Sequence, residues 1–156
     1  MLTYFLPIEN FGTLFVHSIK ENNEIFSTTK NGKIPLIGAD DIAKAAFDAL
    51  YAEKSANTDY YVVGPELYTY DEASTFSALF TEVLGRKITH KHLTDEEELA
   101  LYQSFGLSKE YAAMLNAGEG LVANGSEEAF VGTNKTITGT HTLRQFVEAN
   151  KQIWLK

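Results

Sequence analysis

The amino-acid sequence predicts an α/β fold in which strands alternate with helices at first and helices dominate later. Two patterns indicate this fold. Short apolar segments end at Gly, Pro or Asn turn residues, and apolar positions recur at helical spacing behind capping residues. The chain has 156 residues, 44% of them hydrophobic, whereas a typical domain has about 100 to 200 residues. We therefore expect a single domain over residues 1–156, whose element order fits the tail of an α/β fold better than a sandwich or a bundle.

The first elements are short and alternate in type. Residues 2–6 are apolar and aromatic and stop at Pro7, which is typical of a buried strand. A short helix is expected after this proline, because apolar residues recur at helical spacing over 11–18. Two further short strands are predicted over 24–28 and, after an Asn-Gly turn, over 33–37.

Two amphipathic helices follow, with a strand between them. Asp40 and Asp41 open the first helix, where acidic side chains favour the positive end of the helix dipole. Residues 60–63 read as a buried strand that a Gly-Pro pair ends. Thr69 is predicted to cap the second helix in a capping box with Glu72. The residues expected to face the core are Ile42, Ala45, Ala46, Ala49 and Leu50 in the first helix and Ala73, Phe76, Leu79, Phe80 and Val83 in the second.

The remaining elements are mostly helical. A strand is predicted over 87–93, and Thr94 begins a capping box for a helix that runs to about residue 105. Ser108 opens a further helix, and Thr142 caps a last helix over 143–154. These signals are local, because each cap needs only its own side chain and the next helical turn.

A glycine-rich segment, 118–139, separates the last two helices and is expected to be irregular. Gly118, Gly120 and Ala123 match the spacing of the dinucleotide fingerprint G-x-G-x-x-A. That fingerprint needs a tight turn between a strand and a helix N-terminus, where the pyrophosphate binds. The preceding residues, 111–117, indicate a helix instead. We therefore interpret the match as a loop that ends this helix.

Composition excludes several classes of function. Thirteen basic against 21 acidic side chains give a net charge of −8, which repels the phosphates of nucleic acids. The absence of cysteine excludes disulfides, thiolate catalysis and cysteine-bound metals. The apolar stretches are too short to cross a membrane, and the N-terminus does not read as a signal peptide. We expect a cytoplasmic protein that binds neither nucleic acid nor membrane.

No motif identifies catalysis by itself. None of the tyrosines has a lysine four positions on, as a short-chain reductase would require, and no serine lies in a nucleophile elbow. His90 and His92 share a strand face, but a third ligand is lacking, so an exposed sheet edge is favoured over a metal site. His17 and His141 are isolated, and the acidic residues 95–98 are explained by a capped first helical turn. We expect no metal.

Five segments, taken in order, resemble the NmrA-like proteins, which are atypical short-chain dehydrogenases with an NAD(P)-binding Rossmann fold. The segments are 6–11, 32–43, 59–70, 84–97 and 137–154. Residues 106–112 and 150–155 make the resemblance closest to the fungal ergot-alkaloid reductases, the festuclavine and agroclavine dehydrogenases. Two positions depart from the family pattern: Leu6 stands where the family has Arg, and 140–142 stand where it has Arg and Pro.

The resemblance extends over the C-terminal half of that family alone. It implies the C-terminal part of an NmrA-like NAD(P)-binding Rossmann fold, with its last strands and a mainly helical substrate-binding region. The glycine loop and most nicotinamide contacts belong to the N-terminal half, which the sequence lacks. The resemblance therefore implies that this chain alone binds NADPH poorly. Strands that lose their usual neighbours expose edges, so a dimer, a complementing chain or an aggregation-prone monomer is also expected.

The function implied by the resemblance is NADPH-dependent hydride transfer to the C=N iminium of a small, alkaloid-like substrate in ergot-alkaloid biosynthesis. Pro7 and Ile8 would then contact the cofactor, and Glu9, Asn10 and Phe11 would line the substrate crevice. Core packing is an equally good interpretation of Phe11. Two alternatives stay open: a non-catalytic redox-sensing or ligand-binding protein, and a reductase of quinones or azo compounds.

Overall fold

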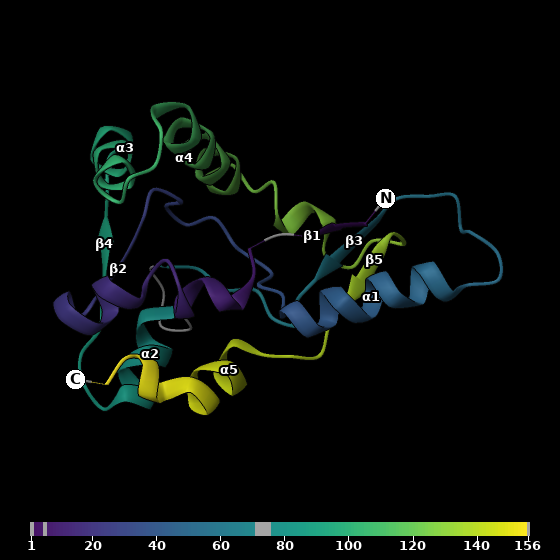
Figure 1. Cartoon of the computed structure of the whole chain (residues 1–156), viewed down its shortest axis with the longest axis horizontal. Helices are drawn as coiled ribbons and strands as arrows, with labels where there is room; N and C mark the ends of the chain where they lie inside the picture. The colour runs from purple at the N-terminus through teal and green to yellow at the C-terminus, as the bar shows by residue number, and fades with distance from the viewer. Residues whose placement is uncertain (1, 5, 71–75, 156) are drawn as a thin grey trace.

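A computed structural model describes residues 2–4, 6–70 and 76–155 of the chain. Two small parallel sheets lie toward opposite ends of an elongated molecule, as Figure 1 shows. The strands are β1 (Leu2–Tyr4), β2 (Glu24–Ser27), β3 (Tyr60–Val63), β4 (Thr89–His92) and β5 (Thr136–Thr138). One sheet has the order β1-β3-β5, and the other pairs β2 with β4.

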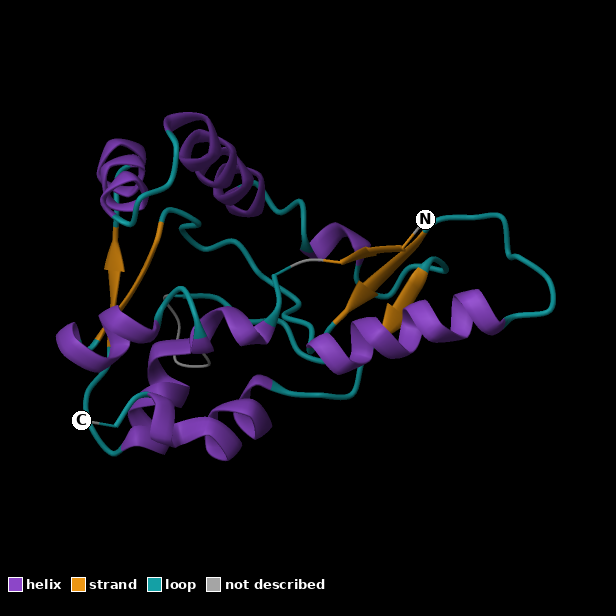
Figure 2. Ribbon diagram, in the orientation of Figure 1, coloured by secondary structure: helices purple, strands orange, loops and turns teal. Residues whose placement is uncertain are grey.

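The three-stranded sheet is built from distant parts of the sequence. Leu2 pairs with Tyr60, and Tyr61 pairs with Thr136, so all three strands run parallel. Parallel neighbours need a crossover connection, and the one between β1 and β3 contains helix α1 (Ala39–Tyr51), which packs along both strands (Figure 2). The predicted strand over 60–63 is confirmed, and the one predicted over 2–6 is described over its first part.

The second sheet is also parallel, and one helix covers it. Glu24 pairs with Thr89 and Ser27 with His92, and α2 (Phe76–Leu84) packs against both strands. The strand predicted over 33–37 is wrong. Ile34 makes an isolated antiparallel bridge with Tyr68, and Ile37 a parallel one with Pro7. The proline at position 35 cannot donate a ladder hydrogen bond, which breaks continuous pairing in this segment.

The remaining helices are α3 (Asp95–Ser104), α4 (Lys109–Ala123) and α5 (Leu143–Asn150). Their predicted caps are confirmed. The Thr94 hydroxyl accepts the N–H of Glu97 at 3.2 Å, and the Glu97 carboxylate accepts the Thr94 N–H at 2.8 Å. Thr142 and Gln145 form the same reciprocal cap on α5, whereas the Ser108 hydroxyl caps α4 by accepting the N–H of Tyr111 alone. The last helix is shorter than expected, because it ends at Asn150 and continues as one 3₁₀ turn, Lys151–Ile153.

Two expectations about α1 and α4 are corrected. Gly118 and Gly120 lie inside α4, so the fingerprint is neither a phosphate loop nor the end of a helix. Two interior glycines cost about 1 kcal/mol each, but Ala112 and Val122 of the same helix are buried and hold it against the core. On α1, the predicted core-facing Leu50 is 87% exposed.

Two further predictions concern helix starts. The segment after Pro7 forms a 3₁₀ turn, Ile8–Gly12, and a π turn, Ser18–Asn22, instead of one α-helix. The predicted spacing nevertheless marks the inward face, since Phe11, Phe15 and Ser18 are buried and Leu14 is partly buried. The predicted capping box of α2 involves Glu72, which lies outside the described residues.

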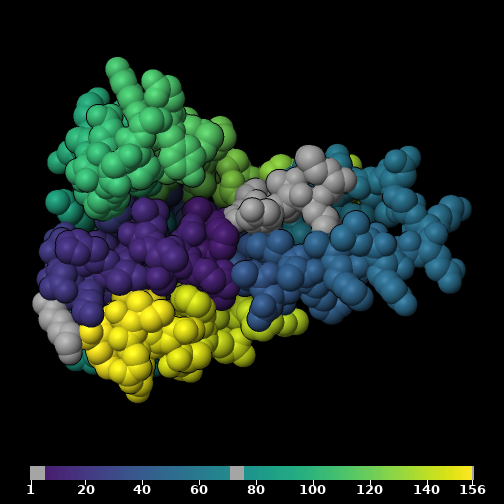
Figure 3. All heavy atoms as spheres, viewed as in Figure 1, coloured from purple at the N-terminus to yellow at the C-terminus, as the bar shows by residue number. Residues whose placement is uncertain are grey.

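The main core gathers aromatic side chains from both ends of the chain. Phe11 lies 5.2 Å from Phe15 and from Phe80, measured between ring centroids, and Trp154 meets Phe80 edge-on at 5.0 Å. The indole N–H of the buried Trp154 donates to the Phe11 carbonyl at 2.9 Å. The N-terminal segment, purple in Figure 3, thus lies between the green α3–α4 lobe and the yellow C-terminal segment.

Candidate functional site

A cavity of about 380 Å³ lies between the N-terminal segment and α4. It opens just beyond the carboxyl end of β1, at Leu6 and Pro7, which is where parallel α/β folds place their ligands. Phe11, Met114 and Val122 add to an apolar lining, as is typical of small-molecule sites. The polar groups of the lining include Asn10, Tyr70, Tyr102, Glu119 and Glu127.

The structure divides the five predicted site residues between two places. Pro7, Asn10 and Phe11 line the cavity, whereas Ile8 and Glu9 line a second hollow of about 440 Å³ beside α5. Phe11 is 1% exposed, so it packs in the core and forms a wall of the cavity at the same time. The roles of these residues in binding stay predictions.

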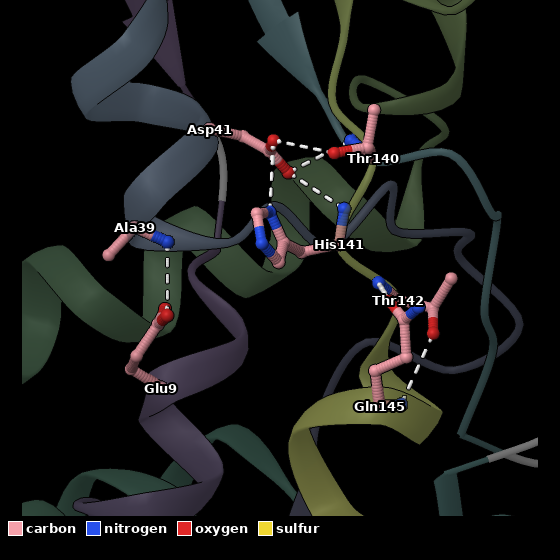
Figure 4. Close-up of polar contacts among 7 residues, drawn as sticks. All are labelled: Glu9, Ala39, Asp41, Thr140, His141, Thr142 and Gln145. Carbon is pink, nitrogen blue, oxygen red and sulfur yellow. Dashed lines mark hydrogen bonds and ion pairs between the residues drawn. The ribbon is translucent and has the colours of Figure 1, made fainter. Parts of the chain in front are cut away.

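Glu9 has a clear structural contact. Its Oε1 accepts the N–H of Ala39, the first residue of α1, at 3.0 Å (Figure 4). A carboxylate at this position satisfies a free N–H and favours the positive end of the helix dipole. The second oxygen, Oε2, is buried without a hydrogen-bond partner among the described residues.

Asp41 is the centre of a cluster that the sequence did not reveal (Figure 4). Its Oδ2 accepts the backbone N–H groups of Thr140 and His141 at 3.0 and 2.9 Å, and its Oδ1 lies 3.0 Å from Nδ1 of His141. Burial raises the pKa of Asp41, but these hydrogen bonds outweigh it and hold the pKa below its ordinary value. His141 is therefore not isolated, and the acidic helix start explains only part of the role of Asp41. The partners lie about 100 positions apart, beyond the reach of local patterns.

Two carboxyl groups meet beside the cavity. Glu119 of α4 lines the cavity, and its Oε2 accepts the N–H of Thr28 at 2.7 Å. Glu98 of α3 lies behind it and is fully buried, and its Oε2 accepts a hydrogen bond from Asn116 at 2.9 Å. The Thr28 hydroxyl lies 3.1 Å from Glu119 and 3.3 Å from Glu98 and has one hydrogen to donate. We call Glu98 and Glu119 the carboxyl pair.

The carboxyl pair holds a proton at neutral pH. Burial and the adjacent Glu98 raise the pKa of Glu119 from 4.5 to about 8. Two neighbouring carboxyl groups in a buried site resist losing both protons. Burial also raises the pKa of Tyr102, whose hydroxyl lies 3.4 Å from Oε1 of Glu119. The pair therefore carries one negative charge and one proton.

The carboxyl pair was also missed by sequence reasoning. The capped first turn accounts for residues 95–97, which are exposed, but not for Glu98, which is buried. The available signal was spacing, because Glu98 and Tyr102 are four residues apart and share one helix face. Glu119 stands in the segment expected to be irregular, so no facing direction was predicted for it.

The two histidines of β4 differ, because His90 turns toward the protein interior whereas His92 is exposed as expected. His90 stacks on Tyr70 with ring centroids 5.1 Å apart, and its Nε2 lies 2.9 Å from the hydroxyl of Ser27. It is thus half-buried, and not at the exposed sheet edge expected. Within the described ranges, no three His, Asp or Glu side chains come together as a metal site would require. None of the described helices has both the length and the apolarity to span a membrane.

The sequence matches fungal alkaloid dehydrogenases. It is 38% identical to an agroclavine dehydrogenase of Claviceps fusiformis over 153 residues, which are 95% of this chain and 52% of that protein. It is 41% identical to a festuclavine dehydrogenase of Aspergillus fumigatus over 143 residues, 88% of this chain and 48% of that protein. The chain spans about half the length of the curated relatives it matches. No family model matches the sequence.

Solved structures show the same fold at low sequence identity. A triphenylmethane reductase of Citrobacter sp. in complex with NADP(H) superposes with a TM-score of 0.71 at 21% identity, over 95% of this chain and 50% of that one. An NADPH-dependent quinone oxidoreductase of Escherichia coli in complex with NADPH gives a TM-score of 0.73 at 20% identity, over 92% and 50% of the two chains. The predicted α/β, Rossmann-like class is confirmed. The chain is therefore similar to the fungal agroclavine and festuclavine dehydrogenases over about half of their length, and it shares its fold with solved NADPH-dependent reductases.

Proposed function

We propose that the chain is the substrate-binding portion of an NADPH-dependent reductase that transfers hydride to the C=N iminium of a small, alkaloid-like molecule. The observation that carries the proposal is the apolar cavity at the carboxyl end of β1, with the carboxyl group of Glu119 in its wall. It occurs in a chain 38% identical to an agroclavine dehydrogenase.

An iminium carbon makes small demands on the protein. It is already electron-poor, so the protein has to bind it, orient it and exclude water, and no proton donor is needed. Phe11 and Met114 supply apolar walls for orientation and water exclusion, and Glu119 places a carboxyl group beside them. The sequence contains no tyrosine–lysine pair of the short-chain reductase type, in agreement with this chemistry.

The residues near Pro7 suit one end of the cofactor and not the other. NADPH, when bound, would supply the hydride. Leu6 and Pro7, beyond β1, would offer an apolar surface to its nicotinamide ring. The hollow on the other side of Pro7 carries Glu9 and Asp40, which repel phosphate groups. The chain alone should therefore bind NADPH weakly.

Two measurements test the proposal. Titration of the isolated chain with NADPH, followed by cofactor fluorescence, should show no saturation at micromolar concentration. A chimera that joins the N-terminal half of the Claviceps fusiformis relative to this chain should consume NADPH in the presence of a 2-methyl-3,4-dihydroisoquinolinium salt. The N-terminal half alone is the control, and an inactive but folded chimera would refute the proposal.

Reduction of a quinone is the second candidate function. The observation that favours it is the proton held by the carboxyl pair, because quinone reduction consumes protons as well as hydride. The same chimera distinguishes the two functions, since menadione and the iminium salt can be offered as competing acceptors. A strong preference for menadione would support the second function over the first.

A further inference from the structure

We propose that Glu119, supported from behind by Glu98, binds the positively charged nitrogen of an apolar monocation, a protonated amine or an iminium, inside the cavity. This inference deepens the proposed function, because it names the charge of the ligand and the side chain that recognises it. It rests on the cavity and the carboxyl pair, and its test requires neither cofactor nor turnover.

The lining of the cavity selects for an apolar cation. Its described ionisable side chains are two glutamates and two tyrosines, and none of its described residues is Lys, Arg or His. Phe11, Phe15 and Tyr70 also line it, and aromatic rings attract cations. A volume of about 380 Å³ is sufficient for a ligand of two or three fused rings.

Charge balance favours a ligand with a single positive charge. The Oε1 of Glu98 is buried and accepts no hydrogen bond from a described N–H or O–H group, so a proton shared with Glu119 would satisfy it. With that proton in place the pair has one negative charge, and a monocation makes the complex neutral. A neutral complex avoids the cost of leaving a charge unpaired in a region of low dielectric constant.

The groups around the carboxyl pair cannot replace such a ligand. Tyr102 of α3 and Tyr70, on the loop before α2, are phenols that burial keeps protonated. Asn116 of α4 and Thr28, after β2, are neutral donors. Glu127, in the segment after α4, is a further carboxyl whose pKa burial raises, and its Oε2 is buried without a described partner.

His90 lies farther from the pair, because it stacks on the ring of Tyr70. Among the described residues, the side chains that contact the pair or line the cavity with it are neutral or acidic, and none is Lys, Arg or His. A cationic ligand would supply the positive charge that these side chains do not.

Isothermal titration calorimetry with matched probes tests the proposal. The probe is 1-methylquinolinium, and its control is quinoline, a ring system of the same shape that is neutral at the working pH. We expect the cation to bind about tenfold or more tightly than quinoline, the effect of one charge-assisted contact. Its affinity should rise as the pH passes about 8, where the pair loses its proton. Quinoline should show no such rise.

Three variants locate the recognition on the pair. Glu98→Gln leaves the single charge on Glu119, so it should retain the preference for the cation and lose the rise near pH 8. Glu119→Gln should weaken the preference, and the double variant Glu98→Gln/Glu119→Gln should abolish it. Glutamine keeps an oxygen that accepts the Thr28 N–H, which helps these variants to fold. Glu110→Gln, on the exposed part of the same helix, is the matched control and should change nothing.

Several outcomes would overturn the proposal. They are equal binding of the two probes, binding of neither, tighter binding of quinoline, or a preference that survives in the double variant. These outcomes are separable from failure of the proposed function. An inactive chimera with intact, Glu119-dependent cation binding refutes the reductase and not the site, whereas an active chimera without that preference refutes the site alone.

Discussion

The single side chain of Glu119 should make the stability of the fold depend on pH. Its pKa is about 8 in the folded chain against 4.5 ordinarily. The folded state therefore binds more protons than the unfolded state between these values, and the free energy of unfolding falls as the pH rises from about 4.5 to about 8. Glu119→Gln should flatten this fall in urea titrations at successive pH values. Glu110→Gln should leave it unchanged, and parallel curves for wild type and Glu119→Gln would contradict the prediction.

Asp41 affects the pH dependence of the free energy of unfolding in the opposite direction. Its pKa lies below 3.8, so it stabilises the folded state above that pH and the contribution is lost as the solution becomes more acidic. Asp41→Asn loses one of two acceptor oxygens and should lower the free energy of unfolding at neutral pH by about 1–3 kcal/mol. Chemical denaturation measures this loss. Asp40→Asn is the control at the exposed neighbouring position, and an equal effect of the two variants would show that the dipole alone matters.

At the scale of elements, Gly139 shows how closely β5 approaches α1. Its N–H donates to the carbonyl of Val63 at 2.8 Å, and a Cβ at this position would collide with the carboxylate of Asp41 and with Ile37. Gly139→Ala should therefore destabilise the fold by about 1–3 kcal/mol. Gly120→Ala, inside α4 with open space around it, should stabilise by about 0.5–1 kcal/mol. Thermal unfolding of the two variants would contradict this if the shifts had the same sign.

The elements that sequence reasoning predicted correctly depend on neighbouring residues. Thr94, Ser108 and Thr142 cap their helices through atoms three positions away, so their signals are complete within one turn. The failures depend on distant partners. The segment around Pro35 bridges to Tyr68 and Pro7 instead of forming a strand, and α4 passes through its glycines because its other face is buried. A local sequence pattern shows neither the bridging partners of the Pro35 segment nor the core against which α4 packs.

The same distinction applies to the candidate site. The resemblance indicated the segment after β1, and Pro7, Asn10 and Phe11 do line the cavity. The chemically distinctive pair could not be predicted, because Glu98 and Glu119 come from different helices and meet only through Thr28 and the α3–α4 packing. Acidic residues in a first helical turn usually need no further explanation, which concealed Glu98.

For the whole molecule, the exposed face of α1 predicts self-association. Phe47, Leu50 and Tyr51 are 61%, 87% and 80% exposed, and the two rings stack 5.4 Å apart. Contiguous apolar surface of this kind favours contact with another chain. Sedimentation velocity should show species larger than a monomer at high concentration, and Leu50→Glu should shift the population toward monomer.

Leu121→Glu is the matched control for that experiment. It places the same charge at a side chain 62% exposed on α4, away from the α1 face. An unchanged distribution for Leu50→Glu, or a wild-type chain that stays monomeric at high concentration, would contradict the prediction.

The buried indole of Trp154 gives the chain an intrinsic fluorescence signal from a single position. Trp154 is the single tryptophan, and it is sealed from solvent against Phe80 while its N–H holds the carbonyl of Phe11, a wall of the cavity. Arg86 fastens the same segment by donating to the carbonyl of Trp154 at 2.9 Å. The wavelength of its emission therefore reads the docking of the C-terminal segment, and its intensity responds to what occupies the space beside Phe11. Ligand binding beside Phe11 should therefore change the emission of Trp154, which needs no added label.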